Sequence, residues 1–518
     1  LFGVRAYPRS VIILTGLLSA LYLAGIRLGV RWFREWLHII EPTASKVLIV
    51  GAGNAGEQLA RAMLADPEYR CRPIAFVDDD PVKRRMQIHG IPVLGTTADV
   101  KAVADRVGAH EIIVAIPSAA PDVRRKILAS AEGCTVPIRI LPSMKRLLGD
   151  PVLLQQVRPM QLEDLLQRDP IQADCRELHP LIGGKTVLVT GAGGSIGSEL
   201  CRQIAQYQPE SLVLFERYEN ALHALLLELR AAFPHVGVLP MVADVTVPDR
   251  VAEVFRRTKP DLVFHAAAHK HVPLMELNPK EAVRNNVIGT RVVAEESLKS
   301  GVERFVLIST DKAVNPSSVM GATKRVAEHL VRNFNGTGTT MFTVVRFGNV
   351  LGSNGSVVPL FAEQIRRGGP VTVTDPEIRR FFMTIPEAVQ LVLQASVMGQ
   401  GGEVFVLDMG EQIKVADLAR NMIVLSGLVP GRDIQIVYTG LRPGEKLYEE
   451  LYEASEEVVP TPHPKIHRVL SHPLPSGDLE RWIMELPERL HHCEDDDVLQ
   501  DLKKLVPTFH PMVSERTS

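Results

Sequence analysis

An apolar strand that leads directly into a glycine-rich turn and then a helix occurs twice in this chain, and no other feature constrains the fold as strongly. The first copy is the strand 46–50 followed by the glycine run 51–56, and the second is the strand 186–189 followed by the glycine run 191–197. Glycine permits such tight turns and lets backbone N–H groups approach a phosphate at the start of a helix. The chain is therefore predicted to contain two parallel-sheet units in series, each with a dinucleotide-type turn.

After the second turn, apolar strands continue to alternate with helical stretches as far as the strand 343–347. Strands separated by helices form a parallel sheet with helices on both faces and ligand sites at the carboxyl ends of the strands. The predicted fold class is α/β, with two Rossmann-like doubly wound domains in series. The predicted organisation is an apolar helix with a basic segment (1–45), an accessory nucleotide-binding-like domain (46–140), a connector (141–182), a catalytic domain (183–455) and a C-terminal tail without assigned function (456–518).

The N-terminal segment is the least polar part of the chain. Residues 10–26 carry no charge, and Arg27, Arg31 and Arg34 follow them. A helix over about residues 11–30 approaches the ~30 Å of a hydrocarbon core, so a transmembrane helix is predicted; the alternatives are a buried helix and, less well matched, a signal peptide. Arginines after the span place the rest of the chain in the cytoplasm, attached to the cell (inner) membrane. Because the chain begins with leucine, we expect a fragment that starts near the last of several spans.

Charge and cysteine content argue against several other classes of protein. The formal net charge of −2 does not suit a general nucleic-acid binder, which needs a basic face for phosphate contacts. The five cysteines include no Cys-x-x-Cys pair, which favours a reduced, cytosolic protein over a disulfide framework. In the polar run 491–494 the histidines, cysteine and glutamate are adjacent and rarely converge on one ion, so no metal site is expected.

Residues 309–325 carry the most specific pattern. They read Ser-Thr-Asp-Lys-Ala-Val-Asn-Pro-Ser-Ser-Val-Met-Gly-Ala-Thr-Lys-Arg and open a helix predicted to run to about Phe334. Together with the glycine run 191–197, this segment resembles the extended short-chain dehydrogenases/reductases, which carry Tyr-x-x-x-Lys on this helix. Here Lys324 is the lysine, but Met320 holds the place of the tyrosine, and a thioether cannot take a proton.

That departure, next to Thr310-Asp311-Lys312, narrows the resemblance to the long, membrane-attached nucleotide-sugar 4,6-dehydratases. The resemblance implies a UDP-N-acetylglucosamine 4,6-dehydratase that keeps the configuration at C5 and serves polysaccharide or glycan biosynthesis. Such an enzyme oxidises C4, eliminates water across C5 and C6, and returns the hydride to C6. A tightly held NAD and a UDP-sugar substrate are implied with it.

An elimination needs an acid and a base together, and Asp311 and Lys312 supply both types of group. At neutral pH Asp311 would have to hold a proton and Lys312 to lose one. Burial shifts both pKa values in these directions, whereas a tight ion pair between the two opposes both shifts. Because neighbours in a strand point to opposite faces, both can reach one sugar only if the chain turns near Thr310, and a turn is predicted there. The alternative is that Asp311 caps the following helix and Lys312 is solvated.

The resemblance implies that Lys324 binds the nicotinamide ribose. With Met320 in place of tyrosine, the group that deprotonates the sugar 4-hydroxyl stays open among Lys312, Asp311 and a water held by Thr310. The predicted catalytic residues are Thr310, Asp311, Lys312, Met320 and Lys324.

The second strand of the second unit ends at Glu216 and Arg217. An acid at this position accepts hydrogen bonds from the adenosine ribose, whereas Arg217 could pair with the 2′-phosphate of NADP; the prediction is NAD. By resemblance, the other cofactor-binding residues are Gly191, Gly194, Ser195, Ile196, Gly197, Asp244, Val245, Ala266, Ala267, Ala268, Asn286 and Lys324.

The loop and helix after the strand 343–347 resemble the segment that holds the sugar diphosphate. Arginine suits a diphosphate because its planar fork donates two parallel hydrogen bonds, although each arginine considered could also lie in a solvated turn. The predicted substrate-binding residues are Lys270, Asn349, Val350, Ser356, Val357, Pro359, Arg379, Arg442 and Glu445.

The first unit shows no acid–base constellation, so no catalysis is expected there. Gly51, Gly53 and Gly56 mark either a site for a second nucleotide or a fold kept without a ligand. For the whole chain, two other functions stay open: a nucleotide-sugar 4-epimerase of the same fold, and a nucleotide-sensing regulator without turnover. The sequence also leaves open whether the chain forms a homo-oligomer.

Overall fold

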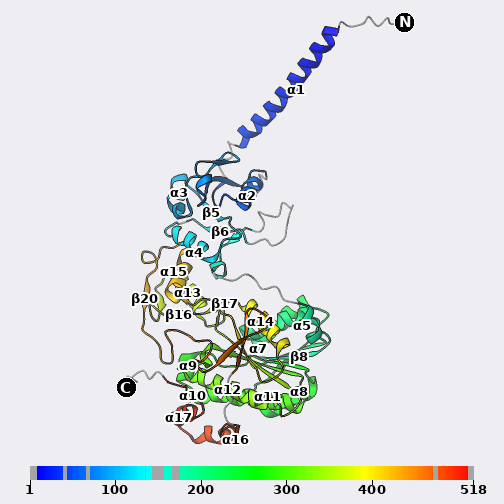
Figure 1. Cartoon of the computed structure of the whole chain (residues 1–518), viewed down its shortest axis with the longest axis vertical. Helices are drawn as coiled ribbons and strands as arrows, with labels where there is room; N and C mark the ends of the chain where they lie inside the picture. The colour runs from blue at the N-terminus through cyan, green and yellow to red at the C-terminus, as the bar shows by residue number, and fades with distance from the viewer. Residues whose placement is uncertain are drawn as a thin grey trace, which may run out of the picture. The chain divides into compact units, whose positions relative to one another are not determined.

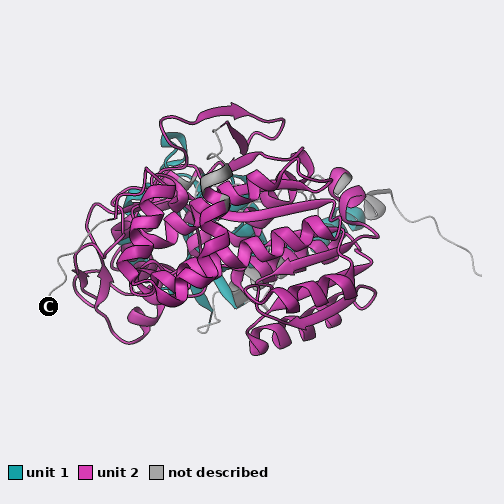
Figure 2. Ribbon diagram, turned by 90° about the horizontal axis from the view of Figure 1, so that it is seen from below, with its two compact units in different colours: residues 1–119, 134–160 teal, residues 120–133, 161–518 magenta. Residues whose placement is uncertain are grey.

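The computed structural model describes residues 9–38, 44–65, 70–134, 136–142, 157–165, 175–470 and 476–511 of the 518-residue chain. Contacts divide the chain into two compact units, coloured separately in Figure 2: residues 1–119 with 134–160, and residues 120–133 with 161–518. The division cuts across the predicted accessory domain and connector, because helix α4 (Pro121–Ser130) makes its contacts with η5 (Leu162–Leu165) and α15 (Val415–Leu425).

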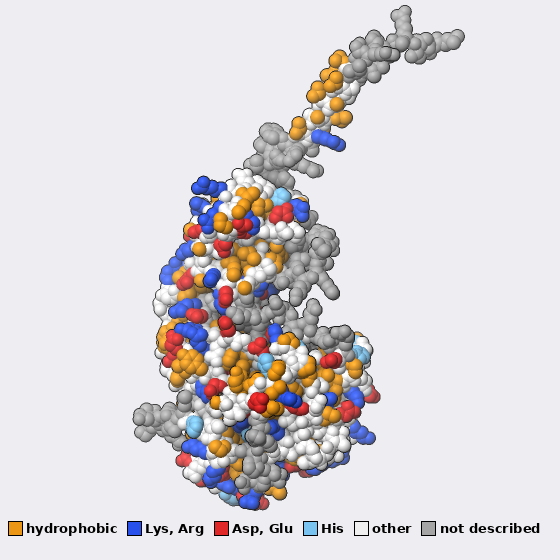
Figure 3. All heavy atoms as spheres, viewed as in Figure 1, with side chains coloured by type: hydrophobic (Ala, Val, Ile, Leu, Met, Phe, Trp, Pro, Cys, Tyr) orange, Lys and Arg blue, Asp and Glu red, His pale blue; other side chains and the backbone are white. Residues whose placement is uncertain are grey.

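Helix α1 (Arg9–His38) covers the apolar N-terminal segment, and its described side chains are exposed (Figure 3). Within the described parts of the chain, no helix combines the length and the apolar character that crossing a membrane requires. The predicted transmembrane helix is therefore not confirmed.

The first unit contains a five-stranded sheet in the order β2-β1-β5-β6-β7, parallel except for β7 at the edge. A Cβ on Gly56 would overlap the carbonyl oxygen of Gly51, so the close approach of α2 to its turn requires glycine. The elements are β1 (Ser45–Val50), α2 (Asn54–Ala65), β2 (Cys71–Val77), η2 (Pro81–Lys83), β3 (Gln87–Ile88), β4 (Ile91–Pro92), η3 (Thr97–Asp99), α3 (Val100–Val107), β5 (Glu111–Val114), β6 (Ile138–Ile140) and β7 (Arg158–Pro159).

The second unit is built on a nine-stranded sheet in the order β10-β9-β8-β11-β12-β13-β18-β22-β21, with helices on both faces (Figure 1). Neighbours from β10 to β18 are parallel, whereas β22 and β21 pair antiparallel. The strand order reverses between β8 and β11, which is where doubly wound folds bind their ligands. The strands are β8 (Thr186–Thr190), β9 (Ser211–Glu216), β10 (Gly237–Val242), β11 (Leu262–His265), β12 (Arg304–Thr310), β13 (Met341–Phe347), β18 (Val404–Leu407), β21 (Glu457–Pro460) and β22 (Ile466–Leu470).

The helices around this sheet confirm the predicted alternation of strands and helices. They are α5 (Cys175–Ile182), α6 (Ser195–Gln206), α7 (Glu219–Ala232), α8 (Pro248–Thr258), α9 (Val272–Glu276), α10 (Pro279–Val283), the π-helical η6 (Arg284–Ile288), α11 (Gly289–Lys299), η7 (Asp311–Ala313), α12 (Val319–Phe334), α13 (Val357–Arg366), α14 (Ile385–Met398), α15, α16 (Ser476–His492) and α17 (Asp495–Leu505). Three small strand pairs carry the segments after β13. They are β14 (Asn349–Val350) with β17 (Phe382–Met383), β15 (Val371–Val373) with β20 (Ile436–Tyr438), and β16 (Arg379–Arg380) with β19 (Ile413–Lys414).

Residues 456–518 were predicted to form a C-terminal tail, but those that the structure describes are part of the folded unit. Strands β21 and β22 extend the large sheet, and α16 and α17 pack in one buried cluster with Met320 and Val326 of α12. Leu479, Ile483 and Leu486 recur at helical spacing and supply the buried face of α16. The high content of proline, histidine and acid in this segment obscured that spacing.

A neutral histidine is buried in the sheet beneath the ligand end. His265 is fully buried, and its ring nitrogens lie 2.8 Å and 3.0 Å from the hydroxyls of Thr190 and Thr290. Burial, assisted by the charge of Lys324, lowers the pKa of His265 to about 3.

Because His265 is buried in its neutral form, the folded chain should lose stability as the pH becomes acidic. Because the unfolded chain takes up the proton near pH 6.5 and the folded chain only near pH 3, the free energy of unfolding should fall as pH drops between these values, by about 1.4 kcal/mol per pH unit. Urea unfolding at several pH values should show this slope reduced in His265→Asn and unchanged in the exposed control His223→Asn. Equal slopes in both variants would contradict the assignment.

Candidate active site

The turn between β8 and α6 forms a cradle that only glycine fits. A Cβ on Gly191 would lie 2.8 Å from the Cα of Ala267, and one on Gly197 would overlap the carbonyl oxygen of Gly191. Helix α6 therefore begins directly against the strand ends, with its free N–H groups at the turn. This is the arrangement that holds a dinucleotide pyrophosphate, so the residues present fit a nicotinamide dinucleotide.

Glu216 lies beside this turn at the end of β9. Its Oε2 accepts a hydrogen bond from the N–H of Gly193 at 3.0 Å, and its Oε1 accepts from Arg217 and Tyr218 at 2.9 Å each. The guanidinium of Arg217 lies 3.5 Å from Asp244. Although burial opposes it, hydrogen bonds from Thr246 and the charge of Arg217 lower the pKa of Asp244. Arg217 is thus engaged by a carboxylate, which favours a ribose hydroxyl over a 2′-phosphate at this position.

A cavity of about 570 Å³ lies at the carboxyl ends of β8, β11 and β12. It brings together residues that are far apart in sequence and that were predicted separately for catalysis, cofactor and substrate. Those lining it are Gly191, Gly194, Ser195, Ile196, Gly197, Ala266, Ala268, Lys270, Thr310, Lys312, Met320, Lys324, Asn349, Val350, Ser356, Val357, Arg442 and Glu445. The N–H of Asn354 also donates to Oγ of Ser195 at 3.1 Å, which joins the glycine turn to the predicted diphosphate loop.

Several predicted residues lie outside this lining. The side-chain amide of Asn286 accepts a hydrogen bond from the N–H of His269 at 2.8 Å and donates one to the carbonyl of His269 at 3.0 Å. Asn286 therefore fixes the loop that follows β11, although it does not line the cavity. Val245 is buried in the core and Pro359 is exposed on α13, so neither faces the cavity. The complete group outside the lining is Glu216, Arg217, Asp244, Val245, Ala267, Asn286, Asp311, Pro359 and Arg379.

The arginine of β16 that faces the cavity is the residue after the one that was predicted. Arg380, not Arg379, lines the cavity, because neighbours in the extended strand β16 face opposite ways. The guanidinium of Arg380 donates to the carbonyls of Lys446 at 2.8 Å and Leu447 at 3.2 Å, and lies 3.3 Å from Glu445. Arg380 therefore fixes the loop that carries Arg442 and Glu445.

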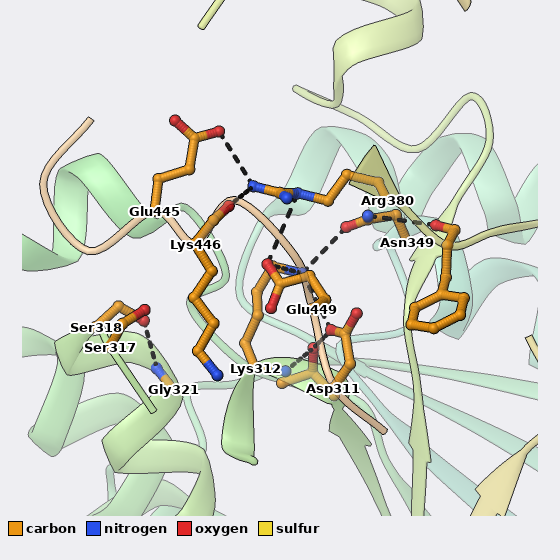
Figure 4. A network of polar contacts seen from close by, with 12 residues as sticks. Asp311, Lys312, Ser317, Ser318, Gly321, Asn349, Arg380, Glu445, Lys446 and Glu449 are labelled. Carbon is orange, nitrogen blue, oxygen red and sulfur yellow. Dashed lines mark hydrogen bonds and ion pairs between the residues drawn. The ribbon is translucent and has the colours of Figure 1, made fainter. Parts of the chain in front are cut away.

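The chain turns at Thr310, as predicted, and the turn separates the roles of Asp311 and Lys312. Oγ1 of Thr310 accepts from the N–H of Lys312, and η7 follows. Lys312 lines the cavity, and its Nζ donates to Asp311 Oδ1 at 3.0 Å and to Asn349 Oδ1 at 3.1 Å (Figure 4). Asp311 is fully buried behind it and does not line the cavity. Contact of Asp311 with the sugar therefore stays a prediction, whereas Lys312 faces the cavity.

The charge state of Lys312 also differs from the expectation. Burial alone would lower its pKa, but the carboxylates of Asp311 and Glu449 outweigh burial and raise it. Lys312 forms a tight ion pair with Asp311, and this is the arrangement that opposes loss of its proton. Lys312 is therefore an ammonium that can donate a proton, and not a free amine that can accept one.

Lys324 and Met320 lie on the cavity side of α12. Nζ of Lys324 donates to the carbonyl of Ile308 at 2.7 Å, and burial lowers the pKa of Lys324 to about 8. Met320 is buried and contributes no polar atom. The lining therefore holds a thioether, and not a phenol, four residues before Lys324.

Gly321 sets the distance between α12 and the Lys312 backbone. A Cβ there would overlap the carbonyl oxygen of Lys312, and no neighbouring side chain could yield in its place. Gly321→Ala should therefore shift η7, lower the unfolding free energy by about 1–3 kcal/mol and reduce turnover about 10- to 100-fold. Urea unfolding and turnover of the same preparation test this. The control Ala322→Gly should lose stability through backbone freedom while its folded fraction turns over normally; equal turnover in Gly321→Ala would refute the spacing role.

Glu449 was not predicted from the sequence, and nor was a smaller cavity of about 190 Å³ that adjoins the first. Lys312, Asn349, Arg380, Arg442 and Glu445 line both cavities, whereas Glu449 lines only the smaller one. Glu449 follows the Arg442 loop in a segment without periodicity, so only its acidic character next to that loop could have pointed to it.

The first unit repeats the contact seen at Glu216. Asp78, at the end of β2, accepts a hydrogen bond from the N–H of Ala52 at 2.7 Å, and Lys83 lies 3.2 Å from the same oxygen. A nucleotide in this unit stays a prediction.

The second unit combines a parallel doubly wound sheet, a glycine cradle at the switch point and a lysine–carboxylate centre after β12. Together these features define an enzyme of the short-chain dehydrogenase/reductase type. Comparisons with known proteins agree. A family model described as polysaccharide biosynthesis protein matches residues 187–471, and one described as a CoA-binding domain matches residues 2–142.

Relatives of the chain include polysaccharide biosynthesis proteins and nucleotide-sugar enzymes. The probable polysaccharide biosynthesis protein EpsC of Bacillus subtilis is 46% identical over 451 residues, which cover 87% of this chain and 75% of that protein. An inverting UDP-N-acetylglucosamine 4,6-dehydratase of Campylobacter jejuni is 33% identical over 281 residues, covering 53% of this chain and 80% of the relative. Other relatives are named UDP-glucose 4-epimerases. The X-ray structure of Pen from Bacillus thuringiensis matches with a TM-score of 0.52 and 35% identity, covering 56% of this chain and 90% of that one.

The chain belongs to the polysaccharide biosynthesis protein family.

Proposed function

We propose that the chain is a UDP-N-acetylglucosamine 4,6-dehydratase that uses NAD and supplies a 4-keto-6-deoxy sugar nucleotide for polysaccharide biosynthesis. One observation carries the proposal: a charged lysine, held between the carboxylates of Asp311 and Glu449, faces a cavity that also contains a dinucleotide cradle. Oxidation alone does not need such a centre, whereas elimination of water needs a proton donor next to the departing hydroxyl.

The residues around the cavity divide the work. The glycine cradle and Glu216 hold the dinucleotide, and Lys324 positions its nicotinamide ribose. When bound, NAD supplies hydride acceptance at C4 and hydride return at C6. Arg442 and the loop from Asn349 to Val357 hold the sugar diphosphate. The uridine and the N-acetylglucosamine are taken from the C. jejuni relative.

Met320 supports retention of the C5 configuration. The proposal rests on the resemblance to the long dehydratases, among which methionine at this position goes with enzymes that keep this configuration. NMR of the product in comparison with both C5 epimers tests this part of the proposal.

The membrane location is a separate proposal. Leu14, Leu17, Leu18 and Leu21 of α1 expose apolar surface that water does not favour. We propose that this helix attaches the chain to the cell membrane, with the catalytic unit in the cytoplasm. Membrane fractionation with and without residues 9–38 tests it; recovery of both forms in the soluble fraction would overturn it.

The function is tested by incubating the protein with NAD and UDP-N-acetylglucosamine and following the product by mass spectrometry. A dehydratase yields a product lighter by one water. A 4-epimerase yields an isomer of unchanged mass, and a regulator without turnover yields bound, unchanged substrate. Either of the last two results would overturn the proposal.

A further inference from the structure

The smaller cavity has no function in the roles assigned so far. It measures about 190 Å³ and adjoins the larger cavity at Lys312 and Asn349, which line both. Most residues of its lining carry polar side chains, and those that line the smaller cavity alone include Val272, Ser317, Ser318, Lys446 and Glu449. At roughly 30 Å³ of liquid volume per molecule the cavity has room for several waters, and polar cavities of this kind hold ordered water.

Glu449 supplies an acceptor for such water. Its side chain is 4% exposed and lines the smaller cavity, not the larger one. Oε1 lies 3.6 Å from Nζ of Lys312 and 3.7 Å from Nε of Arg380, and Figure 4 shows Glu449 between these two cations. Oε2 is buried, and none of the described residues donates a hydrogen bond to it. A buried carboxylate oxygen without a donor is costly, so a donor inside the cavity is needed, and water is one.

Asp311 also has an unpaired buried oxygen, but its surroundings differ. Its Oδ1 is occupied by Nζ of Lys312 and by the hydroxyl of Thr310 at 2.9 Å, whereas Oδ2 has no partner among the described residues. Oδ2 faces Gly348, where a Cβ would lie 2.9 Å away, and Asp311 lines neither cavity. The unpaired oxygen of Asp311 therefore does not mark a water site in the smaller cavity, whereas that of Glu449 does.

The proposed reaction releases a water at the place where the two cavities meet. Elimination leaves a C5–C6 double bond conjugated with the C4 ketone, so a nucleophile adds to it at C6. Water that remained beside C6 would compete there with the returning hydride. A polar cavity next to the lysine–carboxylate centre takes the water away from C6 without opening the site to bulk solvent.

We propose that the smaller cavity is the site that receives the water released from C6, with Oε2 of Glu449 as the acceptor that holds it. This inference rests on the proposed dehydratase function and deepens it. Glu449 binds water in this account, and no proton transfer is assigned to it.

The step that fills the cavity balances in atoms and electrons. The C5–H bond gives up its proton, and its electron pair becomes the second bond between C5 and C6. The C6–O bond breaks with its electron pair on the oxygen, which takes one proton and leaves as water. One proton is removed from C5 and one is delivered to the oxygen, so the lysine–carboxylate centre ends the step with the number of protons it had before.

The test reduces the volume of the cavity from Val272, a residue of α9 that carries no polar side-chain atom. Val272→Leu adds about the volume of one water and Val272→Phe about that of two. Product formation from UDP-N-acetylglucosamine should fall in that order, by about 10- to 100-fold in Val272→Phe, while binding of the UDP-sugar changes less than about three-fold. C4 oxidation needs no room for water, so reduced nicotinamide should accumulate on Val272→Phe. Leu274→Phe adds volume on the exposed side of α9, outside both cavities, and should match wild type.

A direct measurement accompanies the kinetics. An experimental density map of the wild-type protein should show water within hydrogen-bond distance of Oε2 of Glu449, and the map of a Val272 variant should show less of it. A wild-type map without water on this oxygen overturns the inference.

The kinetic outcomes are equally decisive. Product formation near the wild-type rate in both Val272 variants overturns the inference and leaves the dehydratase function standing. Parallel loss of UDP-sugar binding, C4 oxidation and water release assigns Val272 a packing role and also overturns it; if Val272→Phe does not fold, Val272→Leu decides. A wild-type protein that binds the substrate without releasing water overturns the proposed function, whatever the map shows in the cavity.

Discussion

Replacing Lys312 with methionine is expected to reduce water loss from the bound nucleotide sugar by about 10³- to 10⁴-fold, the upper range for removal of a positioned acid. Lys312 contributes both the proton for the departing hydroxyl and the charge that Asp311 and Glu449 share. Single-turnover measurement of product, alongside titration of UDP-sugar binding, separates the chemical step from affinity.

Two further variants sharpen this test. Lys312→Arg keeps a positive charge between the carboxylates but holds its proton too tightly to donate it. It should therefore retain more stability than the methionine variant and still lose activity. Lys414→Met removes a lysine whose partner is the exposed Glu377 and should behave as wild type. Dehydration by Lys312→Met within about ten-fold of wild type, at equal binding, would refute the role of Lys312.

Replacing Arg346 with methionine is expected to lower the free energy of unfolding by about 3–5 kcal/mol, as for other broken buried ion pairs. The side chain of Arg346, on β13, is fully buried and pairs with Glu328 at 2.7 Å and Glu456 at 2.9 Å. Arg325 joins the same cluster through Glu328 and Glu453. Without Arg346, two buried carboxylates would lose their main partner, and urea unfolding should show the loss.

The same cluster predicts a pH signature. Burial alone would raise the pKa of Glu328, but the guanidinium of Arg346 outweighs burial and lowers it to about 2 from 4.5. The stabilisation is therefore complete above pH 4.5 and is lost as pH falls toward 2; this loss should be weaker in Arg346→Met. The control Arg366→Met breaks an exposed pair with Glu363 and should cost less than about 1 kcal/mol. A change below about 1 kcal/mol in Arg346→Met would contradict the account.

The sheet and the cradle could be predicted from sequence because they depend on local rules. Buried parallel strands appear as apolar runs, and Gly191 and Gly197 are needed by the backbone itself, whatever the rest of the chain does. The turn at Thr310 followed from strand geometry in the same way. The membrane span, in contrast, was inferred from the apolar run 10–26 and its flanking arginines, and the described helix does not support it.

What the sequence could not show depends on contacts between distant segments. Gly348 leaves room for Oδ2 of Asp311, and the pKa of Lys312 is raised by Asp311 and also by Glu449, which lies more than 130 positions later. The orientation of the two-residue strand β16 determines whether Arg379 or Arg380 points into the cavity. None of these arrangements leaves a periodic trace in the chain.

The last two helices set a practical boundary for work on this protein. Trimming the chain at the end of the matched family region, near residue 471, would leave the apolar flank of α12 facing water. A shortened version made for crystallisation or biocatalysis should then aggregate, so its activity could not be measured. Expression plasmids are better designed to keep Leu479 through Phe509, with any purification handle placed beyond them.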